Sequence, residues 1–207
     1  MSRESILHRV RTGLGRSAGQ PIPDPPLVRL HIPEVEMDRR ISSLLARVEA
    51  LAGHAFVAPD PRSAVGGLIE GKTAIASNAP FLAECGIVSL PGVRSGITDC
   101  DELRAICSTA DVGITSADYA LADTGTLVML ASPHEARLIS LLPPAHIAVV
   151  PRERILTGLD ELFSLLPRPA EQTSSMVLIT GPSRTGDIEQ ILVRGVHGPG
   201  QITVVVV

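Results

Sequence analysis

Residues 112–127 read Val112-Gly-Ile-Thr-Ser-Ala-Asp118-Tyr-Ala-Leu-Ala-Asp123-Thr-Gly-Thr-Leu127. They place two apolar strand segments on either side of about ten residues, which is short for a parallel crossover. A tight helical connection between antiparallel neighbours fits this spacing better. In that arrangement Asp118 and the Asp123–Thr126 turn share one edge of the sheet. In a parallel arrangement they lie at opposite edges.

Outward from this stretch, short apolar segments alternate with amphipathic ones. Strands that are apolar at every position and alternate with helices are typical of a mostly parallel sheet covered on both faces. The sequence therefore predicts an α/β fold. The predicted strands are Ala55–Ala58, Thr73–Ser77, Ile87–Leu90, Val112–Thr115, Leu127–Ala131, Ile147–Val150, Val177–Thr180 and Ile202–Val207. The predicted helices are 34–52, Ala64–Glu70, Asp101–Ser108, Arg152–Leu166 and Asp187–Arg194.

The first 33 residues differ from the rest of the chain. Ile6, Leu7, Val10 and Leu14 have helical spacing, and Pro21-Ile-Pro-Asp-Pro-Pro26 is incompatible with a helix or an inner strand. We expect a helical arm and proline-rich linker at 1–33 and one α/β domain at 34–207. A loosely ordered terminus and a segment packed across a partner subunit both remain open for the arm.

Composition limits the function classes. The chain has 207 residues, 44% of them hydrophobic, enough for a core without disulfides or metals. Only 2% are aromatic and the net charge is -4, which argues against nucleic-acid binding. Lys72 is the single lysine, so almost every basic site must use arginine, a residue suited to bidentate carboxylate or phosphate contacts.

The three cysteines Cys85, Cys100 and Cys107 match no metal, cluster or redox spacing and suggest a reducing compartment. The sequence shows no signal core and no apolar run of membrane-spanning length. We expect a cytoplasmic protein with no membrane span, no bound metal and no cofactor of its own.

Ligands of parallel sheets collect where strands end, so the loops 78–80, 116–118, 133–137 and 181–186 are the candidate site. In the last loop Ser183, Arg184 and Thr185 are predicted to precede a helix. Free N–H groups, hydroxyls and a guanidinium there suit an anion, although an ordinary helix cap explains the same residues.

Other candidates are weaker one by one. Asp118 and Asp123 are five residues apart and do not share a helix face, so a paired acid and base is weakly indicated. Arg137 and His134 follow a strand, and His197 lies in Gly195-Val-His-Gly-Pro199. Walker, G-x-G-x-x-G, G-x-S-x-G and H-E-x-x-H motifs are absent from the sequence.

Several of these segments, taken in order, resemble the LUD-domain family, formerly known only as a domain of unknown function. The resemblance is dense over about the last hundred residues and matches in layout before them. It is carried by the segments 110–127, Arg137–Pro143, His146–Val150, Ile179–Glu189 and Gly195–Pro199.

The resemblance implies a three-layer α/β/α fold similar to that of sugar-phosphate isomerases and CoA transferases. It also implies a place in a three-protein system that oxidises L-lactate to pyruvate, with iron–sulfur clusters in two partner proteins. We therefore expect an accessory subunit with an anion-binding cleft, in which Asp118 or Asp123 transfers protons. The ligand-binding residues of that cleft are predicted to be Thr124, Gly125, Thr126, Arg137, Ser183, Arg184, Thr185 and His197.

Two alternatives stay open at this point. One is a free-standing enzyme of the same fold, of isomerase, CoA-transferase or cyclo-ligase type. The other is a non-catalytic interaction subunit. A homo-oligomer is compatible with each of them.

Overall fold

The computed structural model describes residues 2–21, 31–185 and 193–207. Its α-helices are α1 (Arg3–Gly13), α2 (Met37–Ala50), α3 (Pro61–Leu68), α4 (Pro80–Glu84), α5 (Cys100–Cys107), α6 (Leu159–Leu165) and α7 (Pro169–Gln172). Its 3-10 helices are η1 (Ile87–Ser89), η2 (Arg137–Ser140) and η3 (Arg152–Arg154). Its strands are β1 (His54–Val57), β2 (Ala74–Ala76), β3 (Val93–Arg94), β4 (Val112–Ser116), β5 (Tyr119–Leu121), β6 (Thr126–Leu130), β7 (Ala145–Val150), β8 (Ile155–Leu156), β9 (Met176–Thr180), β10 (Arg184–Thr185), β11 (Val193–Arg194) and β12 (Gln201–Val206).

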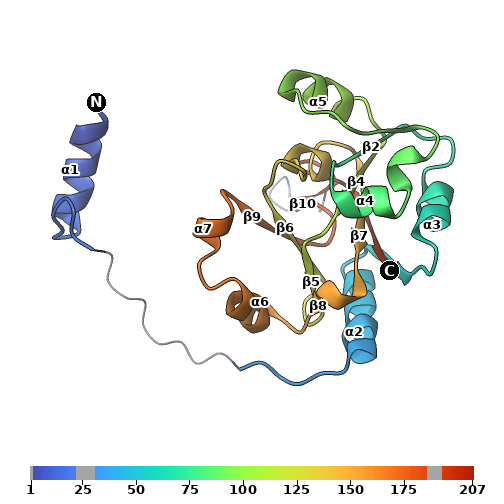
Figure 1. The fold of residues 1–207 in the computed structure, drawn as a ribbon, viewed down its shortest axis with the longest axis horizontal. Coiled ribbons are helices and arrows are strands. Elements are labelled where there is room, and N and C mark those ends of the chain that lie inside the picture. Colours follow the sequence, from blue (N-terminus) through green and yellow to red (C-terminus); the bar gives the residue numbers. More distant parts are fainter. Residues whose placement is uncertain (1, 22–30, 186–192) are drawn as a thin grey trace.

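The central sheet has the order β1-β12-β7-β4-β2-β3, and every pair in it is parallel. One face of this sheet packs against α3 and α4, and the other packs against α2 and a second sheet. Figure 1 shows α3 at the opposite end of the body from α6 and α7. The prediction of a mostly parallel, layered α/β fold is confirmed.

Apolar spacing explains how the layers adhere. Ile41, Leu44 and Val48 repeat at helical intervals along α2 and are buried on the sheet. Gly113 of β4 allows η2 to lie close over the sheet, because a Cβ at this position would be 1.9 Å from the carbonyl oxygen of Ile139. A side chain at residue 113 would therefore push η2 off the sheet.

The second sheet, of order β8-β5-β6-β9, corrects several predictions. The predicted strands at 127–131 and 177–180 belong to this sheet, where β6 runs antiparallel to both β5 and β9. The connection between β4 and β6 is strand β5 and a turn, not a helix, so β4 and β6 are not neighbours. The turn of the β5–β6 hairpin uses Gly125 at φ +71°, a conformation that favours glycine.

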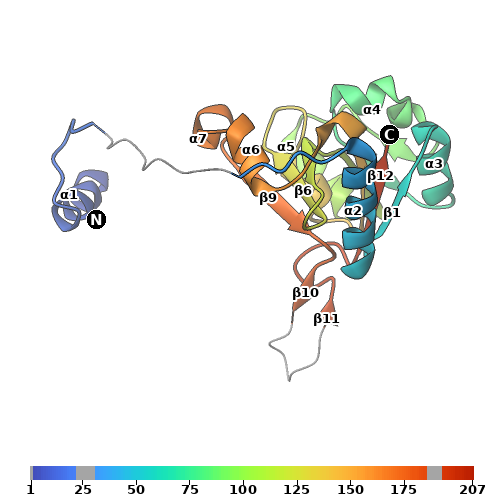
Figure 2. The same cartoon turned by 90° about the horizontal axis from the view of Figure 1, so that it is seen from below.

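Three further predictions differ from the structure. Residues 87–89 form a 3-10 helix instead of a strand, and the predicted helix 152–166 divides into η3, β8 and α6. Of the helix predicted at 187–194, residues 187–192 lie outside the described residues, and 193–194 form β11. Strand β11 pairs with β10, and the two project from the body as a ribbon (Figure 2).

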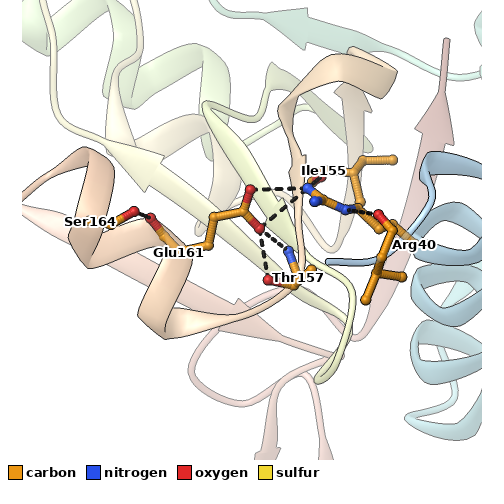
Figure 3. A network of polar contacts seen from close by, with 6 residues as sticks. Arg40, Ile155, Thr157, Glu161 and Ser164 are labelled. Carbon is orange, nitrogen blue, oxygen red and sulfur yellow. Dashed lines mark hydrogen bonds and ion pairs between the residues drawn. The ribbon is translucent and has the colours of Figure 1, made fainter. Parts of the chain in front are cut away.

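A polar network fixes α2 to the second sheet and to α6 (Figure 3). The Arg40 guanidinium lies 3.0 Å from a Glu161 oxygen and also donates to the Ile155 carbonyl of β8. The other Glu161 oxygen accepts from the Thr157 amide and hydroxyl, each at 2.7 Å. Although burial opposes ionisation, these donors lower the pKa of Glu161.

Candidate functional site

A pocket of about 400 Å³ opens where β2, β4 and β7 end, at the carboxyl edge of the central sheet. This is the edge at which parallel sheets bind ligands. Three of the four loops predicted to carry the site meet in it, namely 78–80, 116–118 and 133–137. Its polar lining includes Ser116, Asp118, His134, Glu135, Glu153 and Arg154.

Glu135 is the most unusual group of the pocket. A turn closed by the Ser132 hydroxyl, which accepts from the amides of His134 and Glu135, brings this carboxyl inward until the residue is 7% exposed. Ser77, buried at the end of β2, donates its hydroxyl to Glu135 Oε2 at 2.7 Å. Within the described residues, Glu135 Oε1 is buried without a hydrogen-bond partner.

Burial, and secondarily the nearby charge of Asp118, raise the pKa of Glu135 to about 8. This carboxyl therefore holds its proton at neutral pH. A neutral carboxyl can donate a hydrogen bond or a proton, which an ionised one cannot.

Asp118 is positioned by the second sheet. Its amide donates to the Val128 carbonyl, and its Oδ2 accepts the Leu130 amide at 2.7 Å. Burial raises the pKa of Asp118, against the lowering effects of the Leu130 amide and the Arg154 charge. Asp118 and Glu135 are thus two electrostatically coupled carboxyls in one pocket.

The pocket combines the parts of an acid–base site. Glu135 supplies a proton near neutral pH, Asp118 supplies a second carboxyl, and Arg154 supplies a guanidinium for an anionic group. A volume of about 400 Å³ suits a small molecule. This arrangement can move a proton to or from a small molecule, and Arg154 is the guanidinium among the carboxyls Glu84, Asp118, Glu135 and Glu153 of the lining.

Asp123, the other predicted acid, lies elsewhere. It lines a pocket of about 280 Å³ with His31, Gly158 and Asp160. Its carboxylate lies close over Gly158, where an added Cβ would be 2.5 Å from Asp123 Oδ2. Asp118 and Asp123 therefore do not act in one pocket.

The predicted residues Thr124–Thr126 lie against the C-terminal end of α2. The Thr126 hydroxyl is 2.8 Å from those of Thr124 and Thr180. A Cβ at Gly125 would be 2.8 Å from the Cβ of Arg47. None of the three lines the pocket of Asp118.

In the segment Ser183–Thr185, Arg184 and Thr185 form strand β10 and pair with β11, while the start of the predicted helix lies outside the described residues. The Ser183 amide donates to the Pro199 carbonyl. The Arg184 guanidinium donates to the Leu51 carbonyl, so Arg184 lies at the same end of α2 as Gly125.

Arg137 and His197 lie on a third part of the surface. Arg137 is the exposed first residue of η2. His197 lines a pocket of about 400 Å³ with Leu138 and Leu142, which follow Arg137 in the chain. The predicted single cleft is thus divided, with Asp118, Asp123 and His197 in three different pockets.

Sequence reasoning missed Ser77, Glu135 and Arg154 as site residues. Glu135 stood inside a predicted loop, but its burial depends on Ser77, 58 residues earlier. Arg154 was assigned to a helix that the structure breaks at β8. The strand-end rule was the one signal that led to the edge of the sheet at which this pocket lies.

The three free cysteines lie on two helices. Cys85 ends α4, whereas Cys100 and Cys107 are the first and last residues of α5. Burial raises the thiol pKa of Cys85 and of Cys107, which disfavours the thiolates that a cluster needs. No group of three or more His, Cys, Asp or Glu side chains gathers as metal ligands among the described residues.

The helices of the described ranges include none with both the length and the apolar character needed to cross a bilayer.

Comparison of the sequence and of the structure with known proteins finds relatives of this chain. Lactate utilization protein C of Exiguobacterium sp. is 39% identical over 108 residues, 50% of this chain and 47% of that protein. The protein of the same name from Oceanobacillus iheyensis is 33% identical over 150 residues, 67% of this chain and 64% of that one. The chain thus spans about half to two thirds of the length of these relatives.

A crystal structure of a DUF162 family protein from Deinococcus radiodurans superposes with a TM-score of 0.65 and 19% identity. The superposition covers 84% of this chain and 99% of that one, which shows a shared fold. The sequence model of the LUD domain family matches residues 80–207, a range that contains Asp118, Glu135 and Arg154. The chain belongs to the LUD domain family.

Proposed function

We propose that the chain acts in lactate utilization as an accessory subunit of an iron–sulfur-dependent complex that oxidises L-lactate to pyruvate. The names of the relatives support the lactate part. The family resemblance supports the two partner proteins, which would carry the clusters in the cytoplasm. The pocket of Asp118 and Glu135 is the proposed ligand site.

One observation carries the ligand-binding part of the proposal, namely the buried, proton-holding Glu135 beside Asp118. Arg154 would pair with the carboxylate of lactate or pyruvate, and neutral Glu135 would donate a hydrogen bond to its C2 oxygen. Oxidation of lactate releases two protons and two electrons. Asp118 would accept the hydroxyl proton, and Glu153, which lines the same pocket, would accept the proton of the broken C2–H bond. The two electrons of that bond would pass to the iron–sulfur clusters of the partners.

Reconstitution with both partners tests the subunit role. L-lactate-dependent reduction of an artificial electron acceptor should require this chain. Equal rates with and without it would exclude the role.

The pocket is tested separately with Asp118→Asn and Glu135→Gln. Each variant should lower the rate about a hundredfold or more, the usual effect of removing one acid or base. Glu49→Gln, an exposed change on α2, is the matched control and should keep the wild-type rate. If the complex needs the chain but tolerates both pocket variants, the ligand site lies elsewhere.

A free-standing isomerase-type enzyme is the second candidate. A coupled acid and base in one pocket is also what proton transfer next to a carbonyl requires. Turnover of sugar phosphates by the isolated chain, lost in Glu135→Gln, would favour it. A non-catalytic subunit would show neither turnover nor sensitivity to pocket variants.

A further inference from the structure

Strand β9 is an edge of the second sheet. In the order β8-β5-β6-β9 it pairs with β6 and, among the described residues, with no other strand. Its sequence is Met176-Val-Leu-Ile-Thr180, without a charge or a proline. Natural sheets usually protect edge strands with charged side chains, proline or a bulge, because a bare edge pairs with other chains.

The other edge of the same sheet is protected. In β8 the Ile155 carbonyl accepts a hydrogen bond from the Arg40 guanidinium at 3.2 Å (Figure 3). Figure 2 shows β9 at the margin of the body. A backbone group of the β8 edge thus has a side-chain hydrogen-bond partner, whereas β9 pairs with β6 on its inner side.

The pairing of β9 fixes which of its backbone groups face outward. The Val128 carbonyl accepts from the Asp118 amide, so the backbone of Val128 faces the β5 side of β6. Leu178 is opposite Val128 in the register of β6 and β9. Because the backbone of Val128 faces β5, the two residues form a non-hydrogen-bonded pair, in which both residues direct their N–H and C=O groups away from each other. By alternation, Met176, Leu178 and Thr180 present their N–H and C=O groups to the free edge.

We propose that this edge is a dimer interface, in which β9 of a second copy pairs antiparallel with β9 about Leu178. The outward groups are symmetric about Leu178, so a two-fold axis there places Leu178 opposite its copy and Met176 opposite Thr180 of the copy. Each of these pairs exchanges both of its hydrogen bonds. The two four-stranded sheets would join into one.

Self-pairing suits the side chains as well. Leu178 is 43% exposed on the face that α6 covers, and in the dimer it would contact its own copy. The strand carries no charge that would be brought against a like charge. An identical strand matches this edge in length and in register, so we assign a second copy as its occupant.

Oligomeric mass tests the proposal with the full chain. Light scattering over a dilution series should give twice the 21.8 kDa of the chain at high concentration. Leu178→Lys would place two like charges opposite each other and should raise the dimer Kd by about tenfold or more. Leu142→Lys is the matched control, because Leu142 is equally exposed at 43% but lies beside η2.

Hydrogen exchange tests the register. The amides of Met176, Leu178 and Thr180 should become protected as the protein concentration rises, whereas those of Val177 and Ile179 are protected by β6 at every concentration. A monomer at all concentrations would overturn the proposal. So would a dimer that Leu178→Lys and Leu142→Lys affect equally, with both variants folded by circular dichroism.

Discussion

Replacing Glu135 with glutamine should change how stability depends on pH. Glutamine keeps the shape of the side chain and an oxygen for the Ser77 hydroxyl, but it has no proton to release. In the wild-type protein, burial raises the pKa of Glu135 from 4.5 to about 8. Between these two pH values the unfolded chain loses the proton while the folded chain keeps it.

The magnitude follows from linkage. The free energy of unfolding should fall by about 1.4 kcal/mol for each pH unit in this window, or about 5 kcal/mol in total. The stability that a neutral Glu135 permits is fully present below pH 4.5 and is lost as the pH rises through about 8. Glu135→Gln lacks this loss, so its stability relative to wild type should increase steadily from pH 4.5 to 8. A new amide group in place of Oε1 adds a pH-independent cost of about 1–3 kcal/mol.

Urea unfolding followed by circular dichroism at a series of pH values measures the effect. Titrating groups that do not interact with Glu135 cancel in the difference between the two proteins, so the difference reports Glu135 together with the coupled Asp118. Glu49→Gln, on an exposed position of α2, should show a constant difference from wild type. If Glu135→Gln also differs from wild type by the same amount at pH 5 and pH 8, Glu135 is not a proton-holding buried acid and the proposed site chemistry fails.

Three further predictions concern the scaffold. Burial lowers the pKa of His146 from 6.5 to about 4, so wild-type stability should fall as the pH drops through that range. His146→Gln, which keeps the contact with Thr115, should remove this part of the acid sensitivity in the same urea assay. Gly125→Ala should cost about 2 kcal/mol or more of stability, because φ is +71° and the added Cβ would meet α2. Gly67→Ala on helix α3 should instead stabilise the protein by about 0.5–1 kcal/mol. Thermal unfolding compares the two variants, and equal melting temperatures would contradict this prediction. Glu161→Gln should cost about 1–3 kcal/mol at neutral pH. Because the folded protein lowers the pKa of Glu161 below 4.5, this cost should shrink as the pH falls below 4.5, and a cost that stays constant there would refute the reasoning.

The central sheet was predictable because most positions of its strands are apolar on both faces. Val112–Ser116 is buried at every position and Gln201–Val206 at its last three, so successive apolar residues there indicate inner parallel strands. The second sheet was not separated from it, since β6 is equally apolar. Its membership is decided by the turn at Gly125 and by pairing with β9, which are tertiary features.

The residues of the candidate site were likewise predictable where local sequence determines them and not where tertiary contacts do. Asp118 was predicted from its place after a buried strand, and the strand-end rule selected three of the loops that meet in the pocket. Glu135 was missed because its raised pKa comes from burial and from the charge of Asp118, and both depend on how distant segments pack together. The hydroxyl-rich Ser183–Thr185 segment suggested a helix cap, yet its strand pairing depends on residues 193–194.

The orientation of the Asp118 carboxyl is fixed by the fold, independently of any ligand. Its Oδ2 is engaged by the Leu130 amide, so the carboxyl has little rotational freedom and cannot follow a molecule that binds slightly out of place. The entropy of orienting this group is lost during folding instead of during binding. Molecules that differ in the position of one oxygen should consequently differ sharply in affinity, and β6 would sense occupancy directly through its own backbone.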